Sequence, residues 1–277
     1  MALFGAPRLD MSRKLTGFNR YRQLLSFYTL RWMKVNLLTV AGALPLAAGI
    51  VFSLLTSSVL VLFPACAVGG MIFGPFFAAM VDSIMRGLRD APGEWWTHYK
   101  KSWKQNLKGS LFAGAVLGLL VGLFVFMVNV MIASQVFVGW GTVALFVFSL
   151  LLFLIITTLY WPQLVLFDQS IVKRLQNIVL FTVKHFWKVF GVALLELFYI
   201  AVFVLFAPWT LALVPFIGFW YILFLSEFFL YNDLNNDLQI EKQFIEIEGD
   251  PWALGAFDKA ERLAEEADKK ARENGEI

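Results

Sequence analysis

The amino-acid sequence predicts an all-α, polytopic membrane protein with six transmembrane helices in three hairpins, basic interfacial helices and a cytoplasmic C-terminal helix. Composition is the first observation behind this prediction. Hydrophobic residues make up 59% of the 277 residues and charged residues only 16%, and the mean hydropathy is +0.70, well outside the usual balance of a soluble globular domain. The second observation is that lysine and arginine gather in alternate links between the long apolar runs.

The distribution of positive charge predicts how the chain is oriented. Seven Lys and Arg residues lie in residues 1–34, six in 82–108, four in 163–188 and six after residue 231, whereas the links after the first, third and fifth apolar runs contain none. Positively charged loops of multi-pass proteins stay on the cytoplasmic side. We therefore expect both chain ends and both basic connectors to face the cytoplasm.

The N-terminal segment, residues 1–34, is predicted to be cytoplasmic or interfacial. Residues 16–34 place aromatic side chains at helical spacing, with basic residues elsewhere on the helical wheel, which is typical of a helix in the headgroup region. The apolar run that follows contains Pro45. At about 1.5 Å per residue this run exceeds the ~30 Å hydrocarbon core, so we expect it to tilt, kink at Pro45 or extend beyond the bilayer.

Six apolar runs between residues 35 and 231 form the predicted transmembrane domain. Their boundaries are about 35–62, 65–86, 109–132, 142–166, 189–207 and 211–231. The composition then changes, because 13 of the 20 acidic residues occupy the last 45 positions. Residues 232–277 are predicted to be an acidic cytoplasmic tail, with a helix over about 252–274 that i, i+4 salt bridges support.

Glycines on the third apolar run predict a close helix contact. Gly114, Gly118 and Gly122 are spaced four residues apart, so they lie on one face of a helix and form two overlapping GxxxG motifs. Small residues at this spacing let another helix approach closely. The partner helix belongs either to the same chain, which we favour, or to a second copy of the protein.

One carboxyl group lies deep inside a predicted span. Glu196 falls within the fifth apolar run, whose other residues favour insertion by more than the ~2.5 to 3.5 kcal/mol that a charge costs at mid-bilayer. Such a residue is either a proton or cation site for transport or a neutral side chain hydrogen-bonded to a neighbouring helix. The candidate partners of a transport site are Tyr199 one turn later and Tyr160, Asn129 or Gln163 from other spans.

A second group of polar residues lies where the second apolar run ends. Asp82 and Arg86 are four residues apart, so a helix brings them within reach of an ion pair. Arg86 and Arg89 are candidate contacts for lipid phosphates. The alternative, which we favour, is that these charges only set the topology.

Several kinds of site are not expected. The single cysteine, Cys66, excludes a disulfide within the chain, and neither His98 nor His185 has metal-ligand spacing. Because the chain has no Walker loop, nucleophile elbow or paired-carboxylate site, we expect no cofactor, no metal and no enzymatic activity. The basic connectors are explained by topology, so the expected partner is the lipid bilayer and not nucleic acid.

The stretch from Gly74 to Asn106 resembles a known family. It combines Gly74-Pro75 and Ala78-Ala79 with a charged helix end at 86–90, and then an aromatic connector with Trp95-Trp96, Tyr99, Trp103 and Lys104-Gln105-Asn106. With these features and Leu44-Pro45 after Asn36, the chain is similar to the YesL-like bacterial membrane proteins, a family with a domain of unknown function. A long apolar insert before Gly74 and the acidic tail depart from that pattern. The resemblance implies a place in a bacterial cytoplasmic (inner) membrane and a role linked to carbohydrate uptake, and it supplies no functional residues.

Three functional hypotheses follow from these observations. The first is an accessory or scaffold component of small-molecule transport, with carbohydrate as the substrate that the resemblance suggests, which binds a transport-system protein or a second copy of itself. The second is a proton- or cation-coupled transporter or channel that uses Glu196. The third and weakest is an intramembrane lipid-processing enzyme at Arg86 and Arg89.

Overall fold

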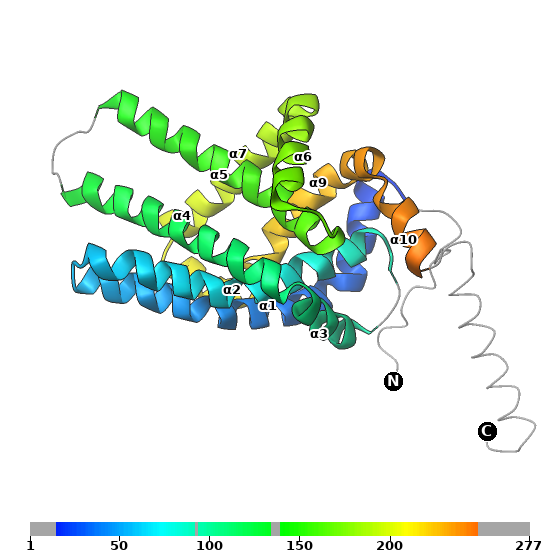
Figure 1. The fold of residues 1–277 in the computed structure, drawn as a ribbon, viewed down its shortest axis with the longest axis horizontal. Helices are drawn as coiled ribbons and strands as arrows, with labels where there is room; N and C mark the ends of the chain where they lie inside the picture. Colours follow the sequence, from blue (N-terminus) through cyan, green and yellow to red (C-terminus); the bar gives the residue numbers. More distant parts are fainter. Residues whose placement is uncertain (1–14, 92–93, 134–138, 249–277) are drawn as a thin grey trace, which may run out of the picture.

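A computed structural model describes residues 15–91, 94–133 and 139–248, and the described chain is helical with no strand (Figure 1). Five helices are long and apolar enough to cross a membrane, or six if one bent pair of segments is a single span. This confirms an all-α protein with several candidate membrane spans. The elements are α1 Gly17–Leu55, α2 Val59–Leu88, α3 Trp95–Gln105, α4 Leu107–Ala133, α5 Trp140–Leu166, α6 Ile171–Lys184, α7 Phe186–Leu205, η1 Trp209–Leu213, α8 Val214–Ile217, α9 Trp220–Leu238 and α10 Ile240–Glu248.

The first hairpin differs from the prediction in two ways. From Gly17 on, the predicted interfacial segment and the first span form one continuous helix, α1. The aromatic face of this helix packs against protein, since Trp32 is fully buried and its ring centroid lies 4.7 Å from that of Phe224 in α9. The link between the first two spans lies at residues 56–58. The sequence predicted this link at residues 63–64, but Pro64 lies inside α2. Prolines inside transmembrane helices are tolerated where neighbouring groups satisfy the freed backbone.

Helix α2 lies at the centre of the bundle and packs between α1 and α4. Its contact with α4 is a seam of small residues: a Cβ atom on Gly118 would lie 2.0 Å from the carbonyl oxygen of Cys66, and one on Gly114 would lie 2.2 Å from that of Gly70. Backbones this close exclude any side chain larger than glycine. The GxxxG face, including Gly122 beside the Cys66 thiol, is therefore occupied by α2 of the same chain.

The sixth span is broken, which the sequence did not predict. Instead of one helix over 211–231, the chain forms η1 and α8, bends by 58° and continues as α9. Pro215 lies in α8 just before the bend and Gly218 lies in the break itself, and both residue types weaken a continuous helix. The bend leaves backbone groups without helical partners inside the bundle.

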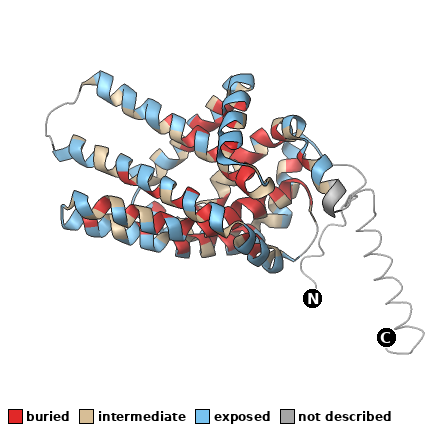
Figure 2. Ribbon diagram, in the orientation of Figure 1, coloured by how far each residue is buried: buried red, intermediate tan, exposed pale blue. Residues whose placement is uncertain are grey.

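Three further helices, α3, α6 and α10, lie towards one end of the bundle, on the right in Figure 1; we call it the basic end. Both basic connectors are thus largely helical, as predicted. Glu94 begins α3 by accepting hydrogen bonds from the backbone and hydroxyl of Thr97, and the hydroxyl bond lowers the pKa of Glu94. Figure 2 shows buried residues concentrated towards this half, whereas the far ends of α4 and α5 are mostly exposed. The predicted tail helix at 252–274 lies outside the described residues.

Candidate functional site

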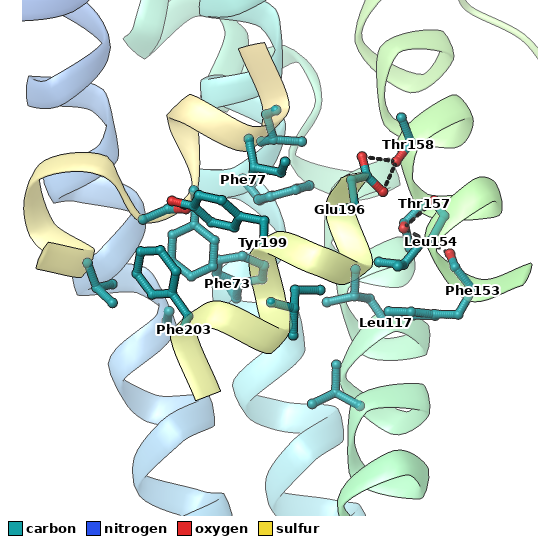
Figure 3. A pocket seen from close by; sticks show the side chains of 18 of the residues that line it. Phe73, Phe77, Leu117, Phe153, Leu154, Thr157, Thr158, Glu196, Tyr199 and Phe203 are labelled. Carbon is teal, nitrogen blue, oxygen red and sulfur yellow. Dashed lines mark hydrogen bonds between the residues drawn. The ribbon is translucent and has the colours of Figure 1, made fainter. Parts of the chain in front are cut away.

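A partly open cavity of about 420 Å³ lies between the helices beside Glu196, and the exposed residues Ile200 and Val204 line part of it (Figure 3). Residues of α1, α2, α4, α5, α7, α8 and α9 line it, and nearly all of them are apolar. Phe73 and Phe77 contribute part of this apolar wall, and the polar side chains in it are Thr157, Thr158, Glu196 and Tyr199. The cavity is therefore an apolar chamber with a carboxyl group at its wall.

The carboxyl group of Glu196 joins three helices. Glu196 is on α7 and is only 5% exposed. The hydroxyl group of Thr158 on α5 lies 2.7 and 2.9 Å from its two oxygens, and the hydroxyl group of Ser226 on α9 donates to Oε1 at 2.6 Å. The side chain is thus hydrogen-bonded to neighbouring helices, as one of the two hypotheses for Glu196 predicts. It also borders a cavity, which the transport hypothesis requires.

The broken span next to this cavity is held by Asn36 of α1. Its Nδ2 donates to the carbonyl oxygens of Val214 and Pro215, both at 2.8 Å, and its Oδ1 accepts from the backbone N–H groups of Phe219 and Trp220. Asn36 is fully buried. One amide therefore satisfies backbone groups on both sides of the bend.

Two further side chains complete the support of the bend. The Tyr199 hydroxyl lies within hydrogen-bonding distance of the carbonyl oxygens of Ile217 and Gly218, at 2.8 and 3.1 Å, and Trp220 Nε1 donates to that of Phe216. Carbonyl groups freed inside an apolar region need such partners, since an unpaired one costs free energy. The cavity, Glu196 and the bend thus form one unit.

Only one of the predicted partners of Glu196 lies at this cavity. Tyr199 lines it, but Tyr160 lies elsewhere on α5, near the guanidinium of Arg174. Gln163 is buried, and its amide donates to the carbonyl oxygen of Leu159 in its own helix. Asn129 does not belong to the site, because it is exposed near the far end of α4. Sequence alone could not decide which faces of α4 and α5 turn towards α7.

The structure also brings in residues that the sequence did not select. Thr158, Ser226 and Asn36 each supply hydrogen bonds at the site. Glu227 of α9 is 1% exposed, and no described residue donates a hydrogen bond to either of its carboxyl oxygens. In the sequence each of these residues is visible only as a polar residue within an apolar run. That pattern does not show which other helix the side chain contacts.

The charged cluster at the end of α2 is largely engaged within the protein. Arg86 pairs with Asp82 at 3.2 Å, as predicted, and the guanidinium of Arg89 lies 3.6 Å from the ring centroid of Phe244. Arg20 of α1 forms a buried ion pair with Asp90 at 2.5 Å. Lipid-phosphate contact stays a prediction; half-buried Arg86 is more accessible than buried Arg89.

Within the described ranges, no group of three or more His, Cys, Asp or Glu side chains has the geometry to hold a metal ion. Comparison of the chain with family models, with curated proteins and with solved structures finds no match. The resemblance to YesL-like proteins therefore stays a prediction, and the cavity beside Glu196 carries the functional argument.

Proposed function

We propose that this protein binds a small, mainly apolar molecule in the cavity beside Glu196 and carries it across the membrane. The observation that carries the proposal is a chamber of about 420 Å³ whose apolar wall holds one buried carboxyl group. Small-molecule sites in proteins are typically of this kind, with a few polar groups that orient the ligand. Glu196 is the group that orients it.

The broken span supports transport rather than binding alone. Val214, Gly218 and Phe219, which belong to the bend or flank it, line the same cavity. In many transporters the substrate site is formed by discontinuous helices, whose breaks allow one part of the bundle to move against another. We infer that the segment from η1 to the start of α9 moves when the ligand enters or leaves.

The chemistry of the cavity argues against a carbohydrate as its ligand. A sugar would bring many hydroxyl groups into a wall that offers few polar partners, and each unpaired group costs free energy. An accessory role in carbohydrate uptake, which rests on the family resemblance, would need another surface of the protein. That role and the lipid-processing enzyme stay predictions.

Narrowing the cavity tests the proposed function. Ala43 of α1 lines the cavity, whereas Ala48 of the same helix is exposed. We expect Ala43→Phe to weaken binding of a compact aromatic probe by about tenfold or more, equal to about 1.4 kcal/mol, and Ala48→Phe to leave it unchanged. The measurement is isothermal titration of the purified protein with tetraphenylphosphonium and with neutral triphenylphosphine oxide. If neither probe binds the wild-type protein, or if both variants behave alike, the proposal fails.

The orientation is a separate proposal, namely that the basic end faces the cytoplasm. Lys101 is exposed on α3 at the basic end, and Ser57 is exposed in the link between α1 and α2. In intact cells a membrane-impermeant maleimide should label Ser57→Cys and not Lys101→Cys, and permeabilised cells should label both. The single native cysteine, Cys66, is buried and serves as the unreacted background. Labelling in the reverse pattern would invert the orientation.

A further inference from the structure

A second buried carboxyl group, that of Glu227, lies near the carboxyl group of Glu196. Ser226, which donates a hydrogen bond to Glu196, is followed directly by Glu227 on α9. Glu227 is more deeply buried than Glu196, and the two carboxyl groups are near enough to act on each other electrostatically. Glu196 borders the cavity and Glu227 does not. The site therefore contains a pair of carboxyl groups, of which one reaches the ligand.

No Lys or Arg of the described residues faces the pair from the cavity side. Among the described residues that line the cavity there is neither Lys nor Arg. Several titratable groups on α7, α9 and the elements near them have described partners or neighbours of their own: Asp82 with Arg86, Arg20 with Asp90, Arg89 over the ring of Phe244, Tyr21 with Tyr221, Tyr160 near Arg174, Tyr231 with Glu241, Tyr199 with backbone carbonyls, Asp233 with Lys188, and Asp237 with Lys184 and His185.

Two neighbouring carboxylates in an apolar surrounding repel each other, and each is costly to bury without a counter-charge. We therefore expect the pair to keep its protons when no cation lies beside Glu196. A positively charged ligand changes this balance, because it supplies the missing counter-charge at Glu196. A neutral ligand of the same shape supplies none.

We propose that the ligand of this cavity is a lipophilic cation, such as an amine or quaternary ammonium compound, and that it is exchanged for a proton of the Glu196–Glu227 pair. The cation enters, the Glu196 carboxyl group releases one proton to solvent, and the resulting carboxylate pairs with the cation. Glu227 retains the second proton, so the pair carries one negative charge against one positive charge. This inference rests on the proposed ligand site and names its substrate class and its coupling ion.

Proton release on binding tests the inference. Purified protein in weakly buffered detergent solution is mixed with tetraphenylphosphonium, and the pH change and the bound probe are both measured. We expect about one proton to be released for each cation bound in acidic to neutral solution, and none with triphenylphosphine oxide. Binding of the neutral probe with equal or higher affinity and no proton release by the cation would overturn the inference while the proposed function stands. Failure of both probes to bind overturns the proposed function itself.

Three variants test whether the Glu196–Glu227 pair is responsible for cation binding and proton release. Glu196→Gln should weaken cation binding by about tenfold or more and abolish the proton release that accompanies it. Asp233→Asn, which removes a carboxyl group from α9 outside the pair, should change neither. Two interacting carboxyl groups lose their protons in two separate steps, so cation affinity should rise with pH in two steps in the wild type and in one step in Glu227→Gln. An unchanged number of steps in Glu227→Gln would show that Glu227 is only structural.

Discussion

Replacing Asn36 by leucine is expected to destabilise the protein by at least about 2 kcal/mol and to abolish ligand binding in the cavity. The change removes four hydrogen bonds to backbone groups of the broken span. Each buried group left without a partner costs about 1–3 kcal/mol, and measured side-chain hydrogen bonds within membranes are at the lower end of that range. The break would then have to refold or admit water.

Thermal unfolding in detergent and titration with tetraphenylphosphonium measure the two consequences for Asn36→Leu. Asn129→Leu is the matched control, since it makes the same chemical change at an exposed position of α4, and it should leave both the melting temperature and the affinity near those of the wild type. Equal stability of Asn36→Leu and Asn129→Leu would mean that the bend does not depend on this amide.

Replacing Gly114 by leucine is expected to separate α4 from α2 and to prevent the protein from folding as a compact bundle. A Cβ atom at this position would lie 2.2 Å from the carbonyl oxygen of Gly70, which is backbone and cannot rotate away. Overpacking a core typically costs about 1–3 kcal/mol, and a larger loss is expected here because the whole helix must shift. Gly70→Leu, on the other side of the seam, should have the same effect.

Gly191→Leu is the matched control for the glycine seam. Gly191 lies within α7 and has nothing within 4 Å of an added Cβ atom, and leucine favours a helix more than glycine does by up to about 1 kcal/mol. We expect this variant to be at least as stable as the wild type. Size-exclusion chromatography in detergent, followed by thermal unfolding, separates the two outcomes. A compact, stable Gly114→Leu protein would contradict the packing of α2 against α4.

The class of the protein followed from local properties of the sequence. The apolar runs of α4, α5 and α7 were predicted close to their structural positions. A run of about twenty apolar residues is long enough to cross a bilayer, and there a helix pairs its backbone N–H and C=O groups. The small-residue face of Gly114 and Gly118 was also visible, since helical spacing alone places these residues together. Orientation came from counting charge and still needs the labelling experiment.

Other features depended on contacts between distant parts of the chain. A stretch as apolar as 211–231 resembles a continuous span, and the break at Gly218 persists because Asn36, far away in the sequence, satisfies the freed backbone groups. Likewise, Glu196 was visible as a buried carboxyl group, whereas its donors, its cavity and its neighbour Glu227 depend on how α5, α7 and α9 pack.

The sequence by itself determined that this is a helical protein of the membrane and that one carboxyl group lies within a span, because hydrophobicity and charge act residue by residue. Only the tertiary structure decided that Glu196 borders a cavity, that Asn129 and Tyr160 do not join it, and that the sixth span is broken. The physical reason is that hydrogen bonds between helices and the fit of one helix surface against another depend on the rotation of each helix, which an almost uniformly apolar run does not specify.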